Sequence, residues 1–158
     1  MDNPTNEYLR SAVMTATPEQ LQLMLYDGAI RFTRQGIEGI RQKQWEDAFN
    51  GFNRAQKIVL ELINALNYDV DRDLCTRMAG LYQFIYRKLV EASVDRNAAA
   101  GEEVLGLLAY QRETWVLLIE KLRQEREGRD APAKPAAGPA PSNDPTLQPE
   151  HGTLCLEC

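Results

Sequence analysis

Few side chains in this sequence have the types and spacing that catalysis or metal binding requires. The single histidine, His151, stands close to a C-x-x-C pair, Cys155 and Cys158, near the C-terminal end. Three such ligands could hold Zn²⁺ or Cu⁺ with a fourth donor from elsewhere, but a structural site normally presents four ligands in closed geometry. We therefore interpret these residues as an adventitious terminus, with metal or redox use as the alternative, and we predict no metal and no cofactor.

Residues 1–127 contain no histidine and one cysteine, Cys75, which removes the usual zinc ligand sets and the usual general base for a Ser or Cys nucleophile. The sequence has no pair of Glu-x-x-His motifs, no phosphate-binding Gly-rich loop and no dinucleotide fingerprint. Two acidic pairs, Glu46-Asp47 and Glu102-Glu103, stand near expected helix starts, where the helix dipole favours negative charge. We expect them to be solvated helix starts rather than general acids or bases, and we predict that the protein is not an enzyme.

Composition narrows the class of protein further. A chain of 158 residues with 44% hydrophobic residues suits one folded domain. The net charge of −5 argues against a nucleic-acid partner, because such a partner requires a positive surface. The longest apolar runs are far shorter than the ~20 residues of a membrane span, and the N-terminus lacks the plan of a secretory signal, so we expect a cytoplasmic protein.

Helical periodicity dominates the chain from Thr17 onward. Thr17 and Gln20 form a capping-box signature around Pro18, and the apolar pattern that follows predicts a helix over residues 18–41. Three glycines interrupt this helix at a cost of up to ~1 kcal/mol each, which predicts close approach of a neighbouring helix at Gly28, Gly36 and Gly39.

Three further amphipathic stretches follow. The pattern predicts helices over residues 45–68, from a cap at Asp71 to about residue 93, and from the turn at residues 95–97 to about residue 127. Short turns between four such helices favour an all-α, antiparallel four-helix bundle. The predicted organisation is a short N-terminal arm or helix (1–17), a helical bundle domain (18–127) and a disordered Pro/Ala-rich tail (128–158).

Several stretches of the sequence match a known family pattern. Residues 12–21 read AVMTATPEQL and residues 24–29 read MLYDGA; residues 81–92 read LYQFIYRKLVEA, and EVLGLL at 103–108 precedes Trp115. Over residues 8–122 the chain resembles the FliS family of flagellin chaperones. It departs from the family pattern at Gln83, Ser93, Thr114 and residues 71–74, which affects local contacts more than the class.

This resemblance implies a cytosolic chaperone that holds the disordered C-terminal segment of flagellin, prevents premature polymerisation and assists delivery to the flagellar type III export gate. It also names the export gate and a co-chaperone or regulator as further partners. By the same match the N-terminal arm lies over the cleft that flagellin occupies, and Tyr8 is the arm residue expected to matter. A bundle with apolar grooves suits this task, because amphipathic helices dock into such grooves.

The candidate partner-binding residues carry two interpretations each. Tyrosine and tryptophan side chains on the apolar stripes pack in the core or contact the partner, and the leucines and methionine pack in the core or line the groove. Asp27 and Arg87 form a structural ion pair or orient the partner. The full set is Tyr8, Val13, Leu21, Met24, Leu25, Tyr26, Asp27, Tyr82, Tyr86, Arg87 and Trp115. The rival function is a generic helical adaptor or homo-oligomer that buries its wide apolar stripes against a copy of itself.

Overall fold

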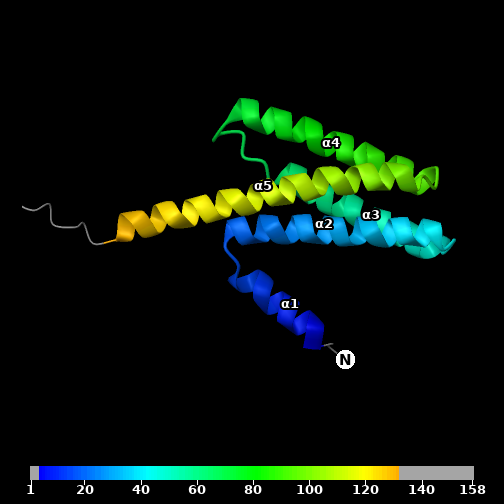
Figure 1. The fold of residues 1–158 in the computed structure, drawn as a ribbon, viewed down its shortest axis with the longest axis horizontal. Coiled ribbons are helices and arrows are strands. Elements are labelled where there is room, and N and C mark those ends of the chain that lie inside the picture. Colours follow the sequence, from blue (N-terminus) through cyan, green and yellow to red (C-terminus); the bar gives the residue numbers. More distant parts are fainter. Residues whose placement is uncertain (1–3, 132–158) are drawn as a thin grey trace, which may run out of the picture. The chain divides into compact units, whose positions relative to one another are not determined.

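The computed structural model describes residues 4–131, which form five α-helices and no strand. The helices are α1 (Pro4–Thr15), α2 (Pro18–Arg41), α3 (Trp45–Asn64), α4 (Arg72–Val94) and α5 (Ala98–Asp130). The chain divides into two compact units, Met1–Lys121 and Leu122–Cys158. Within the first unit, α2, α3, α4 and the first part of α5 run alternately in opposite directions (Figure 1). The predicted all-α, antiparallel bundle is confirmed.

Helix α2 begins where the capping box was expected. The Thr17 hydroxyl accepts a hydrogen bond from the Gln20 backbone nitrogen at 3.2 Å, and the Gln20 side chain accepts one from the Thr17 nitrogen at 3.0 Å. Two backbone donors that a helix start leaves free are thereby satisfied. This cap fixes the start of α2 immediately after α1.

The glycines of α2 allow α3 to approach closely. A methyl group added at Gly36 would lie 2.8 Å from the Phe52 ring, and one added at Gly28 would lie 3.0 Å from the Ile58 side chain. Gly39 faces the backbone of Ala48 in the same way. The predicted close approach is confirmed, and α3 contributes a glycine of its own: a methyl group at Gly51 would lie 2.5 Å from the Gly36 nitrogen.

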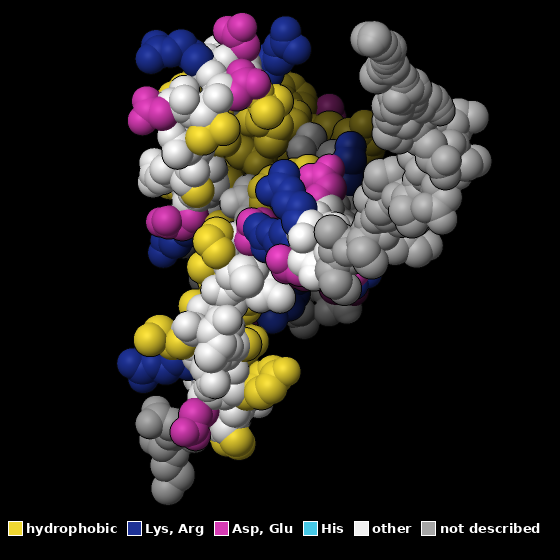
Figure 2. Space-filling model, turned by 90° about the vertical axis from the view of Figure 1, so that its left-hand side faces the viewer, with side chains coloured by type: hydrophobic (Ala, Val, Ile, Leu, Met, Phe, Trp, Pro, Cys, Tyr) yellow, Lys and Arg dark blue, Asp and Glu magenta, His cyan; other side chains and the backbone are white. Residues whose placement is uncertain are grey.

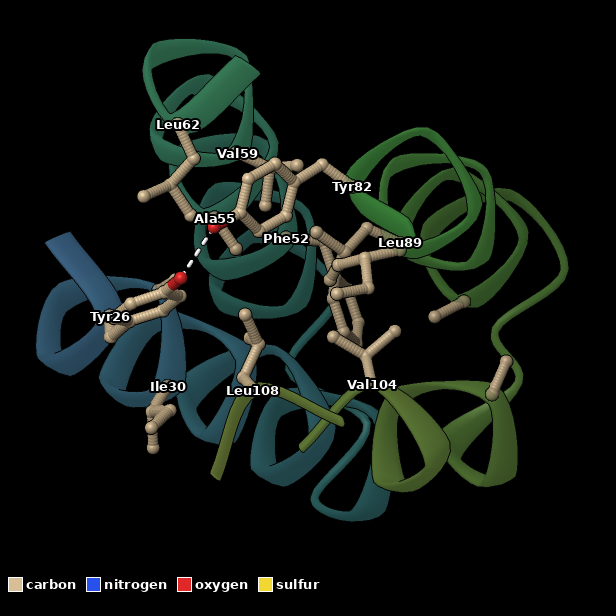
Figure 3. Packing of buried hydrophobic residues seen from close by; sticks show 14 of the residues in the cluster. Tyr26, Ile30, Phe52, Ala55, Val59, Leu62, Tyr82, Leu89, Val104 and Leu108 are labelled. Atoms are coloured by element: carbon tan, nitrogen blue, oxygen red, sulfur yellow. Dashed lines mark hydrogen bonds between the residues drawn. The ribbon is translucent and has the colours of Figure 1, made fainter. Parts of the chain in front are cut away.

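The core of the bundle draws on α2, α3, α4 and α5. Tyr26 comes from α2, Phe52 and Leu62 from α3, Tyr82 from α4 and Leu108 from α5, and each is at most 1% exposed. In Figure 3 these side chains converge from the surrounding helices on a single cluster. Helix α3 lies against both α2 and α4, which makes it the central element of the packing.

Helix α3 ends at Asn64, about one turn before the end expected near residue 68. The backbone nitrogen of Ala65 still bonds to the Glu61 carbonyl oxygen, and after it the chain turns. The Asn67 side chain accepts a hydrogen bond from the Asp69 nitrogen at 3.1 Å, which is the local bonding by which asparagine competes with helix continuation. The apolar side chain of Leu66 therefore belongs to the turn and not to the helix.

The two later helices begin at side-chain caps. Asp71 accepts a hydrogen bond from the Leu74 nitrogen at 2.9 Å, as predicted, and Asn97 accepts one from the Ala100 nitrogen at 3.2 Å. Helix α5 continues to Asp130, three residues beyond its expected end. Gly128 does not adopt a positive φ and so does not form a left-handed cap that would stop the helix.

The described part of the second unit, residues 122–131, continues α5 and carries an i,i+4 ion pair of 2.5 Å between Arg123 and Glu127. The predicted disordered tail and the candidate ligands His151, Cys155 and Cys158 lie outside the described residues, apart from residues 128–131. Among the helices of residues 4–131, none is long and apolar enough to cross a membrane.

Candidate partner-binding surface

Two of the predicted partner-binding residues lie inside the bundle. Tyr26 on α2 is 1% exposed and Tyr82 on α4 is 0% exposed, and their hydroxyls form a hydrogen bond across the core (Figure 3). Burial raises the pKa of Tyr82 well above its usual range, and the hydrogen bond with Tyr26 raises it further. Of the two interpretations for these tyrosines, the structure shows core packing. The pair joins α2 to α4 from within.

Four more candidates are half-buried: Met24, Leu25, Tyr86 and Trp115. The last three pack against the core. The indole nitrogen of Trp115 donates a hydrogen bond of 2.8 Å to the Glu19 carbonyl oxygen. This bond joins α5 to the first turn of α2. It therefore places the apolar residues that follow Trp115 beside the start of α2.

Exposed apolar side chains follow both partners of this bond in the sequence. Leu21 in the first turns of α2 is 36% exposed, and three consecutive residues of α5 are exposed by 37 to 65%: Val116, Leu117 and Leu118. Exposed apolar side chains that gather into a patch are typical of a binding surface. Some of the apolar residues of α5 are therefore not buried in the bundle and remain at its surface.

Helix α1 has no buried residue. Two of its residues are candidates, Tyr8 at 75% and Val13 at 45% exposed, and Leu9 and Met14 are exposed as well. Figure 2 looks toward the end of the bundle where α2 and α4 begin and shows hydrophobic side chains standing out along α1. The arm is thus a helix whose larger apolar side chains remain exposed.

The charged candidates do not pair with each other. Asp27 forms an ion pair with Arg112 of α5, and this carboxylate raises the pKa of Arg112. Arg87 is exposed on α4. Of the two interpretations for Asp27, the structure shows the structural ion pair. The Arg87 side chain is accessible to solvent or to a partner.

A groove follows the seam between α2 and α5. One cavity of about 560 Å³ is lined from α2 by Asp27, Ile30, Arg31 and Arg34, and from α5 by Ala109, Arg112, Glu113 and Val116. A second cavity of about 480 Å³ is lined by Arg34, Ile37, Glu38, Arg41, Glu102 and Leu105. Because Arg34 lines both, the two cavities follow one another along the same seam.

Ion pairs hold α5 to its neighbours at the start of this helix. Arg41 bonds Glu102 at 2.6 Å, and Lys88 of α4 lies 3.3 Å from Glu103 and 3.1 Å from Glu91. The hydrogen bonds with Glu91 and Glu103 raise the pKa of Lys88. Glu102 and Glu103 are exposed, as expected of a solvated pair, and each carboxylate also joins α5 to another helix.

Sequence reasoning missed two parts of this surface. Arg31, Arg34 and Arg112 were not singled out from the sequence, although their spacing beside the apolar stripe places them at the edge of a helix contact. Tyr68, Val70 and Leu74, around the turn between α3 and α4, are exposed by 42 to 81%. They lie at the end of the bundle that Figure 2 faces, where hydrophobic side chains gather in the upper half of the view.

The fold is an all-α bundle that carries exposed apolar side chains and a charged groove at its surface. The family model for the flagellar protein FliS matches residues 1–122. The chain is 33% identical over 128 residues to the flagellar secretion chaperone FliS of Bacillus subtilis (strain 168), covering 81% of this chain and 95% of that protein. This chain therefore belongs to the FliS family of flagellar secretion chaperones.

A second relative agrees with this membership, and a solved structure shares the fold. The flagellar secretion chaperone FliS of Salmonella typhimurium (strain LT2) is 32% identical over 120 residues, which covers 72% of this chain and 84% of that protein. A solved structure described as a flagellar chaperone from bacteria superposes with a TM-score of 0.62 at 20% identity. It covers 75% of this chain and 99% of that structure, which shows that the two share a fold.

Proposed function

We propose that this chain is a cytosolic export chaperone that binds the disordered C-terminal segment of flagellin, prevents its premature polymerisation and assists its delivery to the flagellar type III export gate. Membership of the FliS family gives the class. The observations that support the finer proposal are the exposed apolar side chains of Leu21 and of residues 116–118, together with the hydrogen bond from Trp115 to the Glu19 carbonyl oxygen that joins α5 to the start of α2.

The physical basis of this activity is helix docking. A disordered segment that contains amphipathic stretches gains burial when it lays them on exposed leucine and valine side chains, at about 25 cal/mol per Å² of apolar area. Part of that gain is offset by the cost of ordering the segment, so the complex remains reversible. A chaperone of this kind hides polymerising surfaces without chemistry.

The proposal divides the candidate residues by their placement. Tyr8, Val13, Leu21 and Arg87 are exposed and available for direct contact, whereas Tyr26 and Tyr82 support the surface from within. Four candidates are half-buried between these two groups: Met24, Leu25, Tyr86 and Trp115. Further partners, namely the export gate and a co-chaperone or regulator, are part of the same proposal.

Calorimetric titration with a peptide of the organism's own flagellin C-terminal segment tests the proposal. We expect a one-to-one complex with a large negative heat-capacity change, because a disordered partner folds as it buries apolar surface. A peptide of the same composition in scrambled order serves as the control. Absence of binding over several temperatures would favour the rival hypothesis of a generic helical adaptor or homo-oligomer.

A matched pair of variants locates the surface. Leu117→Asp introduces a charge into the run that follows Trp115, where Leu117 is 65% exposed, and should weaken flagellin binding strongly. Val94→Asp introduces the same charge at the end of α4, where Val94 is 73% exposed, and should leave affinity unchanged. Equal effects of both variants would contradict the assigned surface. Monomer mass in sedimentation would further exclude the homo-oligomer.

A further inference from the structure

The Trp115 side chain joins α5 to α2 across 96 positions of the sequence. Its indole nitrogen donates a hydrogen bond of 2.8 Å to the Glu19 carbonyl oxygen. The ring is half-buried and packs against the core. An indole has one polar group, a donor, and here that donor is already bonded within the bundle. It is therefore not available to a partner while this bond is made.

The bond lies where both helices carry exposed apolar side chains. Glu19 stands in the first turn of α2, which the capping box fixes, and Leu21 follows two residues later at 36% exposure. Residues 116–118 directly follow Trp115 and are exposed by 37 to 65%. A helix advances 1.5 Å per residue, so each of these exposed side chains starts within about 5 Å, along its helix, of a bonded residue. The bond thus constrains how the two exposed groups are placed relative to each other.

A second contact between α5 and α2 lies one turn earlier in α5. Arg112 pairs with Asp27, but the two side chains are 42% and 50% exposed, so water screens their attraction. The hydrogen bond of Trp115 is partly buried and has a defined donor and acceptor. It is therefore the more specific of the two constraints.

We propose that Trp115 is a positioning residue of the client surface. Its bond to the Glu19 carbonyl oxygen holds the exposed apolar side chains of α2 and α5 in the arrangement that the client meets. The inference rests on the proposed function, and it adds how the surface is held ready before binding. A surface already in its binding arrangement binds more tightly, because none of the binding free energy is lost in ordering it.

Removal of the donor tests this role in the full-length chain. Trp115→Phe keeps an aromatic ring and loses the N–H group, so titration with the flagellin C-terminal segment should give a Kd raised about two- to tenfold, as expected for one hydrogen bond. Trp45→Phe is the matched control, because Trp45 begins α3 and stacks on Arg96 at 4.1 Å. Its Kd should equal that of the wild type.

Two further measurements separate positioning from stability and from direct contact. Val59→Ala shortens a core side chain that is 0% exposed, and it should lower the melting temperature without changing the Kd measured well below that temperature. Amide hydrogen exchange in the free protein should be about two- to tenfold faster at residues 21–24 in Trp115→Phe and unchanged in Trp45→Phe. A residue that only contacts the client would not alter exchange in the free protein.

Each outcome bears on one claim. If the wild type binds and Trp115→Phe has an unchanged Kd, the positioning role is overturned alone. A raised Kd with unchanged exchange at residues 21–24 also overturns it, in favour of direct contact, and an equal rise in Val59→Ala overturns it in favour of general stability. Absence of binding by the wild type overturns the proposed function itself.

Discussion

At the scale of single residues, the hydroxyl pair of Tyr26 and Tyr82 is the polar centre of an apolar core. Each hydroxyl lies where water does not reach, so each depends on the other for a hydrogen bond. A pair of this kind favours one arrangement of α2 against α4, because other arrangements would leave a hydroxyl unsatisfied.

A double-mutant cycle measures this dependence. Tyr82→Phe alone should lower the free energy of unfolding by about 1 to 3 kcal/mol, because the Tyr26 hydroxyl loses its buried partner. Tyr26→Phe should act similarly, and the double variant should be less destabilised than the sum of the two. Denaturant unfolding followed by circular dichroism supplies the three values. Simple additivity would show that the hydroxyls do not depend on each other.

The sequence predicted where aromatic residues lie along the helices, and the structure decides which way each faces. Tyr26 and Tyr8 are both tyrosines of the expected site, yet one is 1% and the other 75% exposed. Periodicity places a residue on a helical face but does not say which face meets another helix when the apolar stripe is wide. For the same reason the pairing of Asp27 with Arg112, 85 residues apart, could not be predicted.

At the scale of elements, the contact between α2 and α3 depends on glycines at matching positions. Gly36 and Gly39 receive Phe52 and Ala48, and Gly51 meets the α2 backbone at Phe32 and Gly36. A helix interior normally loses up to ~1 kcal/mol with each glycine. Here the loss is offset by packing that no larger residue would permit.

Alanine substitutions at two glycines distinguish packing from helix propensity. Gly51→Ala should lower the free energy of unfolding by about 1 to 3 kcal/mol or more, because the added methyl group meets backbone atoms at 2.5 Å. Gly80→Ala on α4 should raise it by up to about 1 kcal/mol, because no atom lies within 4 Å of the added group. Thermal melting checks both. Stabilisation by Gly51→Ala would contradict the described approach of α2 and α3.

Helix starts were easier to predict than helix ends. Thr17 and Asp71 form the caps that their side chains favour, so the starts of α2 and α4 follow from local bonding alone. The end of α3 depends on the turn at Asn67, and α5 passes through Gly128 without stopping. At both ends the helix can continue or a turn can form, and the two alternatives differ by little in free energy.

At the scale of the whole molecule, the apolar surface assigned to binding lies within residues 4–131. We therefore expect that removing residues 132–158 leaves the affinity for the flagellin segment unchanged. Titration of the truncated and full-length chains with the same peptide checks this expectation. A clear loss of affinity on truncation, with helix content retained, would show that the C-terminal region contributes to binding.

The placement of α3 between α2 and α4 has a consequence for the order in which the chain folds. The tightest contacts join helices that are neighbours in the sequence, so α2, α3 and α4 can assemble through short loops. Local contacts of this kind speed folding. Helix α5, in contrast, contacts α2, from which it is far in the sequence. Glu102 of α5 pairs with Arg41 of α2, and Trp115 of α5 donates to the Glu19 carbonyl oxygen of α2. We expect α5 to dock last, so a nascent chain exposes its unfinished core on that side until synthesis has passed Trp115.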